Sequence, residues 1–474
     1  VPVLVFAGAS PFTQQGELTG SRTEFIHWLQ DVFDQRGIVR QYMRYENEIR
    51  TGVNVKQMVY RALQFAESDP RGPVYLMGAR EVMEQETVRA EVDRTCWPLL
   101  AKAPAAESFL DALVAALALA QRPLVVTSYV GRRTEAVAEL VGFAELAGAG
   151  VLESVPNYMN FPAGHALYQG VQGNEPRQSE ALAAADLVIV IDSDVPWIPT
   201  VNKPQDGIPV FHIDVDPLKE DIPLWQLPAK HAVKANAATV LRQLNAKLTG
   251  SRTGAFWRSR HAAWARDLAA REAGNSGAIT AITAEYLTSR LRRQLGADTI
   301  VLNEAVTSYK AVAEGLGARR EGSVFTSGGG SLGWNGGAAI GFKLAEPKKT
   351  VVAITGDGSF MFSIPATVHW MARRYNTPFL QIVLNNGGWR APRLSATTVH
   401  PGGYASRGAD IGTAFEMPPD YGGIAAAAGG ALALKVEDRA EVDEAIARGL
   451  RAVQTEGRSA VLDVLMADRA TSSV

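Results

Sequence analysis

The sequence predicts an α/β protein built from three doubly wound parallel-sheet domains, and three observations support this fold class. Apolar runs of strand length alternate with helical stretches along most of the chain, which is typical of parallel sheets covered by helices. A chain of 474 residues is too long for a single hydrophobic core. Less regular stretches interrupt the alternation twice, so we place the domains at residues 1–95, 106–245 and 278–474.

The first predicted domain opens with an apolar stretch, Val1 to Gly8, that indicates a core strand. A polar loop follows it, and helices are expected over residues 24–32 and 55–68, with a closing strand over 73–77. Two strands are few for a sheet that must bury both faces. We therefore expect that earlier strands of this domain are missing from the sequence and that the domain is truncated at its N-terminal side.

The central predicted domain follows a linker at residues 96–105. Its expected helices span 107–120 and 133–147, and its expected strands span 124–127, 150–153, 186–191 and 210–214. A connector over 245–277, with two tryptophans among charged residues, is expected to be mobile. The last domain then opens with a helix over 281–295 and a strand over 299–302.

The composition excludes several classes of partner. Net charge is −2 and no block of Lys or Arg is present, so neither nucleic acid nor an anionic membrane surface is expected to bind. No stretch is long and apolar enough to cross a bilayer. Cys96 is the single cysteine, so an internal disulfide is excluded, and the residues after Val1 lack the features of a signal peptide. A cytoplasmic location is expected.

The most informative stretch is residues 350–389, where two apolar strands flank a helix. The first strand ends in Gly356-Asp357-Gly358-Ser359 and the second in Asn385-Asn386-Gly387-Gly388. A right-handed crossover brings both ends to the same edge of a parallel sheet, where α/β proteins bind ligands. A carboxylate, an amide oxygen and a backbone carbonyl form a hard oxygen site that suits Mg²⁺ and phosphate. The helix after the first turn would direct its N–H groups at the same phosphates.

This Gly-Asp-Gly turn, followed by Asn-Asn-Gly at the end of the next strand, resembles the thiamine diphosphate signature. Over essentially the whole chain, and most strongly from Leu302 to Gly388, the sequence is similar to the thiamine-diphosphate-dependent decarboxylase and carboligase superfamily. Acetolactate synthase and benzoylformate decarboxylase are its nearest branches. The resemblance implies pyrimidine-binding, central and diphosphate-binding domains. It also implies a homodimer or a dimer of dimers with active sites at the subunit interface.

The resemblance assigns roles to individual residues of the last domain. Asp357 and Asn386 match the side-chain Mg²⁺ ligands, and Gly388 matches the backbone carbonyl ligand. Leu332 matches the apolar residue that holds the cofactor in its bent form, and Gly330 the backbone acceptor of the 4′-amino group. The full set of implied cofactor contacts is Asn303, Glu304, Thr307, Gly330, Ser331, Leu332, Gly356, Gly358, Ser359, Gly388 and Trp389.

The family also has a glutamate that activates pyrimidine N1′, and no residue of this sequence matches it. In the family this glutamate precedes the strand that matches residues 1–6. We expect it in an N-terminal portion missing from this sequence; the alternative is a chain without the activator. Glu17 and Glu24 follow the matching strand and are not assigned this role.

Substrate contacts are indicated less strongly than cofactor contacts. Arg390 or Arg393 could pair with a substrate carboxylate through a bidentate contact. His400 lies in a stretch, 394–419, rich in Gly, Ser and Thr that could close over the site. The first-domain loop supplies three further candidates, for which a solvated surface role is the alternative: Gln14, Arg22 and His27.

Flavin binding is an open alternative in the central domain. Residues 212–217 resemble a segment that contacts FAD in acetolactate synthases. Residues 192–197 and 128–132 depart from the flavin-binding pattern, so FAD is not expected.

The predicted function is that of a thiamine-diphosphate- and Mg²⁺-dependent lyase or transferase. Such an enzyme breaks or forms a C–C bond next to the keto carbon of a 2-oxo acid, because the cofactor supplies an electron sink. Decarboxylation and carboligation are both open. One alternative is an enzyme similar to 2-hydroxyacyl-CoA lyase or oxalyl-CoA decarboxylase, and another is a cofactor-binding subunit without catalytic activity.

Overall fold

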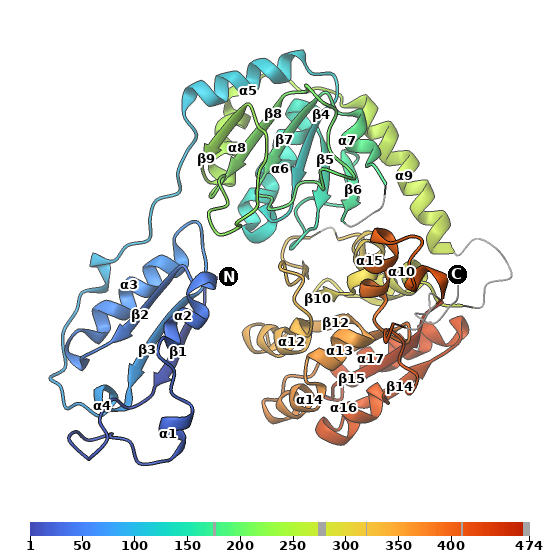
Figure 1. Ribbon diagram of the computed structural model, residues 1–474. Coiled ribbons are helices and arrows are strands. Elements are labelled where there is room, and N and C mark those ends of the chain that lie inside the picture. Colours follow the sequence, from blue (N-terminus) through green and yellow to red (C-terminus); the bar gives the residue numbers. More distant parts are fainter. Residues whose placement is uncertain (174–176, 274–280, 319, 409–410, 468–474) are drawn as a thin grey trace. The chain divides into compact units, whose positions relative to one another are not determined.

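The computed structural model describes residues 1–173, 177–273, 281–318, 320–408 and 411–467 (Figure 1). The described chain forms two compact units. Residues 1–105, 213–228 and 232–239 make up one, and the remaining described residues make up the other. The strands form three sheets, and every strand pair whose register is known is parallel. The predicted fold class, α/β with three parallel sheets, is therefore confirmed.

The first sheet has three strands in the order β1-β3-β2. They are β1 (Leu4–Ala9), β2 (Tyr45–Ile49) and β3 (Val74–Ala79). Helix α3 (Val55–Glu67) packs on the sheet, with Ala62 and Ala66 buried against Val74 and Leu76. Short helices lie between and after these elements: α1 (Ile26–Leu29), α2 (Gln35–Val39) and α4 (Arg80–Met83).

The central sheet has six strands in the order β6-β5-β4-β7-β8-β9. Its inner strands β4 (Pro123–Thr127), β5 (Gly150–Ser154) and β7 (Leu187–Ile191) are buried throughout. Fully buried strands of this kind read as continuous apolar runs, which is why the sequence locates them well. The other elements are β6 (Tyr168–Gln172), β8 (Val210–Asp214), β9 (His231–Lys234), α5 (Glu107–Leu119), α6 (Thr134–Ala147), α7 (Glu180–Ala184), α8 (Ala237–Lys247) and α9 (Ala255–Ala273).

The C-terminal sheet, in the order β11-β10-β12-β13-β15-β14, contains the sequence motifs of interest. Its strands are β10 (Thr299–Glu304), β11 (Val324–Phe325), β12 (Thr350–Gly356), β13 (Leu380–Asn385), β14 (Leu432–Val436) and β15 (Ala460–Leu465). Its helices are α10 (Ala284–Gln294), α11 (Tyr309–Leu316), α12 (Trp334–Ala345), α13 (Asp357–Phe362), α14 (Pro365–Arg374), α15 (Arg390–Val399), α16 (Tyr421–Gly429) and α17 (Val442–Gln454). Three apolar clusters, distributed over the two sides of the buried strands, form the core.

The first domain differs from its sequence-based prediction in three respects. Strand β1 is not a core strand: Val5 and Phe6 are 38% and 53% exposed, because β1 lies at an edge of its sheet. A third strand, β2, was not predicted, because its charged sequence does not alternate cleanly; Glu46 pairs with Arg36 and Arg40 at 3.1 and 2.9 Å. The helix expected over residues 24–32 is the four-residue α1.

The connector over residues 245–277 is also not the mobile segment that was predicted. Residues 255–273 form the 19-residue helix α9, and residues 274–277 lie outside the described part. Trp257 is fully buried against Gly150, and Trp264 forms an edge-to-face contact with Tyr168 at 5.4 Å. The two tryptophans therefore anchor α9 on the central sheet. Among the described residues, no helix combines the length and hydrophobicity required to span a bilayer.

Candidate functional site

The ends of four parallel strands lie side by side at one edge of the C-terminal sheet. Their registers align the last residues of β10 with β12, of β12 with β13, and of β13 with β15. In particular, Gly356 pairs with Leu384. The turns that follow β12 and β13, which carry Asp357 and Asn386, are neighbours for this reason. The sequence-based prediction of their adjacency is confirmed.

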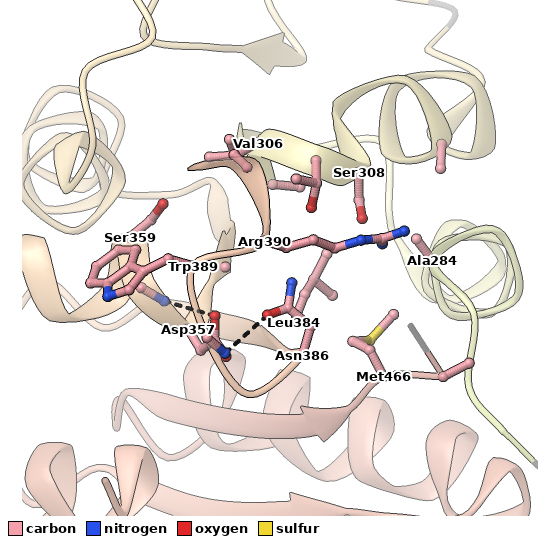
Figure 2. Close-up of a pocket in the computed structure, with 18 of the residues that line it drawn as sticks. Ala284, Val306, Ser308, Asp357, Ser359, Leu384, Asn386, Trp389, Arg390 and Met466 are labelled. Atoms are coloured by element: carbon pink, nitrogen blue, oxygen red, sulfur yellow. Dashed lines mark hydrogen bonds between the residues drawn. The ribbon is translucent and has the colours of Figure 1, made fainter. Parts of the chain in front are cut away.

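A pocket of about 280 Å³ opens at this edge (Figure 2). Its wall combines strand-end turns with the start of α10 and the segment after β15. The lining residues are 282–285, 305–308, 311, 332, 356–359, 384, 386, 388–392 and 466–467. The pocket therefore brings together six chain segments that are separated in the sequence.

Asp357 organises the floor of the pocket. Its side chain is buried, with 2% of the residue exposed. Oδ1 accepts a hydrogen bond from Gly358 N at 2.8 Å, and Oδ2 accepts from Gly387 N and Gly388 N at 2.7 and 3.0 Å. Burial raises the pKa of the Asp357 carboxyl, and these N–H donors oppose the rise because they favour the charged form.

The two asparagines after β13 have different roles. Asn385 is a structural residue: its Nδ2 donates to Asp463 Oδ1 at 2.8 Å and its Oδ1 accepts from Gly387 N at 3.1 Å. Asn386 lines the pocket instead, with its Oδ1 accepting from Gly388 N at 3.2 Å. The double asparagine thus supplies one residue for the turn and one for the site.

The donor set of this floor fits a hard divalent cation. Asp357 and Asn386 contribute side-chain oxygens, and Gly388 a backbone carbonyl that also accepts from Arg390 N at 3.1 Å. Oxygen-only sites of this kind suit Mg²⁺. Within the described part of the chain, no group of three or more His, Cys, Asp and Glu side chains is arranged for metal binding. A site built from one carboxylate, one amide and one carbonyl is therefore the chemistry that the floor offers.

Glycines at two positions of the floor are required by close contacts. A Cβ at Gly388, where φ is +155°, would lie 2.1 Å from Thr413 O. A Cβ at Gly358 would lie 2.2 Å from the ring of Trp389. Trp389 packs edge-to-face with Phe362 and Phe415 at 5.3 and 5.2 Å, so its ring is fixed over the first turn of α13.

The opposite wall carries hydroxyl groups and a strained backbone. Val306 has φ of +36°, which is costly for a β-branched residue and occurs mainly where the surroundings impose it. Thr307 and Ser308 follow it on the pocket wall. In Figure 2 the side chain of Arg390 extends across the pocket toward Ser308 and Ala284. This wall is suited to an anionic or strongly polar ligand.

Most of the predicted cofactor and metal residues lie on the pocket wall. These are Thr307, Leu332, Gly356, Asp357, Gly358, Ser359, Asn386, Gly388 and Trp389. Leu332 is 36% exposed. The predicted helix after Gly358 is divided: α13 begins at Asp357 and has six residues, and α14 begins at Pro365 after Ile364 with φ of +56°.

Four predicted cofactor residues lie off the wall. Gly330 and Ser331 are exposed on the loop before Leu332. Asn303 is buried and its Oδ1 accepts from Ala305 N at 3.1 Å. Glu304 is fully buried, and its carboxylate accepts from the N–H groups of Gly333 and Asn335. The list of these residues is Asn303, Glu304, Gly330 and Ser331.

Among the predicted substrate residues, only Arg390 lines the pocket. Arg393 donates through Nη2 to Ala405 O at 3.1 Å, and His400 caps the end of α15. The stretch that was predicted to close over the site begins as the second half of α15, and residues 409–410 within it lie outside the described part. The first-domain candidates belong to the other compact unit. There, Arg22 donates to His27 O and Trp28 donates to Gln14.

Sequence reasoning missed the pocket residues from the start of α10 and from the end of β15. Thr283 caps α10 by accepting from Tyr286 N at 3.2 Å, and Ala284 and Glu285 follow it on the wall. Met466 and Ala467 continue β15. The signal that could have found them is the strand order, because β15 pairs with β13 and so ends beside Asn386.

Comparison with known proteins places these features in a family. Residues 305–464 match the thiamine pyrophosphate enzyme C-terminal TPP binding domain, and residues 110–244 match the thiamine pyrophosphate enzyme central domain. The two matches together cover more than half of the chain. The first of them contains the strand ends, turns and helices that form most of the pocket wall.

Two curated relatives and one solved structure are similar along most of the chain. Glyoxylate carboligase of Escherichia coli O157:H7 is 25% identical over 399 residues, which cover 81% of this chain and 64% of the relative. Acetolactate synthase large subunit of Corynebacterium glutamicum is 24% identical over 455 residues, 92% of this chain and 69% of the relative. Thiamine diphosphate-dependent 4-hydroxybenzoylformate decarboxylase of Rhodococcus jostii RHA1 has a TM-score of 0.77 at 19% identity, covering 99% of this chain and 83% of that one.

The chain spans less than two thirds of the glyoxylate carboligase, while the structural likeness shows the fold of both units. With the two domain matches and the pocket at the strand ends, the chain belongs to the thiamine pyrophosphate enzyme family.

Proposed function

We propose that this protein is a thiamine-diphosphate- and Mg²⁺-dependent lyase or transferase that breaks or forms a C–C bond next to the keto carbon of a 2-oxo acid. The observation that carries the proposal is the oxygen donor set of Asp357, Asn386 and Gly388, which lies on one floor with Leu332 in the same pocket. The names of the similar proteins, a carboligase, a synthase and a decarboxylase, support a reaction of this class.

Different residues of the pocket would bind the cation, the phosphates and the organic part of the cofactor. Asp357, Asn386 and Gly388 would hold the cation through oxygen atoms. The hydroxyls of Thr307 and Ser359 would donate to phosphate oxygens, and Leu332 would give the organic part of the cofactor an apolar contact. Thiamine diphosphate supplies the electron sink when bound, and the protein supplies position and electrostatics.

Arg390 is the residue that we propose to bind the carboxylate of the substrate. It is the one arginine of the pocket wall in the described chain, and a guanidinium matches a carboxylate with two parallel hydrogen bonds. Arg393 offers a matched control, because it lies one helical turn later on α15 and is absent from the pocket wall. We expect R390A to raise KM for the 2-oxo acid about tenfold or more, and R393A to leave KM within about threefold.

We also propose that two copies of this chain assemble around the site, in the cytoplasm, as the resemblance implies. Helices α13 and α14 support an interface because they expose large apolar side chains. Phe362, Ile364 and Trp370 are 58%, 66% and 54% exposed, and apolar patches of this kind mark interaction surfaces. We expect wild type to sediment as a dimer or tetramer and W370E to shift toward monomer. L119E, at an exposed position at the end of α5, should not shift.

The central experiment measures carbon dioxide release from 2-oxo acids with small, aliphatic and aromatic side chains. Wild-type protein is supplied with thiamine diphosphate and Mg²⁺, and the products are identified as aldehydes or ligated hydroxyketones. We expect turnover on part of the panel that is abolished by EDTA and restored by Mg²⁺. Tight cofactor binding by calorimetry without any turnover on the panel would instead support the non-catalytic subunit.

A further inference from the structure

Glu304 forms an unusual contact beside the pocket without lining it. The residue is the last of β10 and is fully buried. Its two carboxylate oxygens accept separate backbone hydrogen bonds, Oε1 from Gly333 N and Oε2 from Asn335 N at 2.7 Å. Both donors belong to the first turn of α12, which lies about thirty residues later in the chain. A strand residue therefore caps the helix that follows the Leu332 loop.

The cap is needed because the helix does not supply its own. Its N-cap residue is Gly333, which has no side chain to accept the first N–H groups, and buried N–H groups without partners are costly. A Cβ at Gly333 would lie 2.5 Å from the carbonyl carbon of Phe362. The backbone just after Leu332 is therefore held from two sides, by Glu304 on β10 and by the end of α13.

A series of hydrogen bonds between buried polar side chains continues from Asn335 through the domain. Asn335 Nδ2 donates to Ile354 O at 3.1 Å, and Asn335 Oδ1 accepts from Gln381 Nε2 at 3.3 Å. Gln381 Oε1 in turn lies 3.0 Å from His369 Nε2 on α14. These hydrogen bonds connect α12 to β12 and β13, the two strands that precede the metal-site turns.

We propose that Glu304 is a positioning residue whose carboxylate fixes Leu332 relative to the floor around Asp357. Leu332 directly precedes Gly333 in the chain. Gly333 packs against Phe362, the last residue of helix α13, and Asp357 is the first residue of the same helix.

The Asp357 carboxylate is held by Gly358 N, Gly387 N and Gly388 N and not by the Glu304 contact, so a change at Glu304 is expected to move one wall of the pocket and to leave the three metal-site oxygens in place. The expected effect of Glu304 on the kinetics rests on the proposed function, whereas the hydrogen bonds of Glu304 to Gly333 and Asn335 do not depend on it.

The environment of the carboxylate agrees with this role. Burial raises the pKa of Glu304 to about 7, and the N–H groups of residues 333–335 oppose the rise because they favour the charged form. The Glu304 carboxylate provides both acceptors that the buried N–H groups of Gly333 and Asn335 require. Glutamine cannot provide both, since its amide nitrogen would face one of the N–H groups.

The first test measures the contact without any cofactor, by amide hydrogen exchange of the peptide that spans Gly333 and Asn335. A hydrogen bond to a charged group corresponds to roughly a tenfold or larger change in opening. We expect exchange of these amides to be at least about tenfold faster in E304Q than in wild type. The control is E180Q, which replaces an exposed glutamate of the central domain and should leave this peptide within about twofold.

The second test separates positioning from loss of folded protein. With cofactor-saturated enzyme, we expect E304Q to lower kcat about 10- to 100-fold. The Kd of thiamine diphosphate in Mg²⁺ and the KM of the 2-oxo acid should stay within about threefold, because the metal-site oxygens do not move. E304D keeps the charge on a shorter side chain and is expected to recover part of kcat. If E304Q does not fold, E304D is measured against wild type in both tests, with a smaller loss of amide protection and of kcat expected because the shorter side chain keeps the charge but not the full reach.

Unchanged protection of the peptide in E304Q, or an unchanged kcat despite lost protection, overturns the positioning role. A parallel rise in the Kd of thiamine diphosphate by more than about tenfold also overturns it, because the floor would then have moved too. Lost protection combined with no turnover by the wild type supports the contact and refutes the proposed function, so the two failures are distinguishable.

Discussion

Replacing Glu153 with glutamine is expected to make the protein more stable than wild type above neutral pH, and equally stable in acid. Glu153 lies in β5 of the central sheet and is 6% exposed. Asn160 donates to its Oε1 through the backbone N and Nδ2 at 2.9 and 3.0 Å, and Tyr168 OH donates to Oε2 at 2.9 Å. Glutamine can keep the contacts to Asn160, and Tyr168 can accept from its amide nitrogen.

The magnitude follows from the pKa of this carboxyl. Burial raises the pKa of Glu153 from 4.5 to about 7, against the opposing effect of its hydrogen-bond donors. The folded state therefore holds the proton up to about pH 7, while the unfolded chain releases it near 4.5. Stability falls as the pH rises through this window, and the full penalty above pH 7 is about 3 kcal/mol, of which about 2 kcal/mol develops between pH 5 and 8.

The assay is equilibrium urea unfolding of wild type and E153Q, measured side by side from pH 5 to 8. The difference between the two chains removes the contribution of every other titrating group, and the midpoints convert to free energies through the common slope. E180Q is the control, because the Glu180 side chain is 86% exposed and its pair with Arg260 contributes under about 1 kcal/mol. A stability difference between wild type and E153Q that stays constant from pH 5 to 8 would refute the reasoning.

Three further predictions concern the C-terminal sheet and its contacts. G358A should destabilise the fold by about 1–3 kcal/mol, because the new methyl group meets the Trp389 ring; thermal unfolding and tryptophan fluorescence measure the cost and the displacement. E314Q should weaken the packing of α11 on α9 by about 1–3 kcal/mol, since the buried Glu314 pairs with Arg271 at 3.2 Å; faster hydrogen exchange in α9 is the readout. N386A should weaken Mg²⁺-dependent binding of thiamine diphosphate by about tenfold or more, as measured by calorimetry, with unchanged thermal stability of the cofactor-free protein.

The parts of the site that follow from local sequence could be predicted before the structure was known. Asp357 and Asn386 each come directly after a buried apolar strand, and the topology of a parallel crossover then places them together. Four strands of the central sheet, β4, β5, β7 and β8, were found for the same reason, because a doubly covered strand reads as an unbroken apolar run, whereas the more polar β6 and β9 were not predicted. The hydrophobic pattern and the residue spacing are sufficient to predict a site residue where one strand and the turn after it contain the whole motif.

The parts that depend on long-range contacts could not be predicted. The family resemblance places Glu304 among the cofactor contacts, and nothing in its local sequence indicates that its carboxylate accepts hydrogen bonds from Gly333 and Asn335, which lie 29 and 31 residues later at the start of α12. Strand β2 was missed because its charges are satisfied by arginines of the preceding helical segment. Helix α9 was predicted to be a mobile connector because its sequence is rich in charged residues. The burial of Trp257 depends on contacts with the central sheet, and the local sequence does not indicate these contacts.

The same long-range logic explains why the proposed metal site needs an aspartate at position 357. Oδ2 of this residue already accepts from Gly387 N and Gly388 N, so it holds the turn that carries the other two oxygen donors. Oδ1 accepts a single hydrogen bond, from Gly358 N, and keeps a lone pair for a cation. Asparagine would place an amide nitrogen against N–H groups, and glutamate would push the turn away. The donor atoms are therefore brought together by the chain itself, and in the proposed site a cation would meet oxygens whose positions the fold has already set.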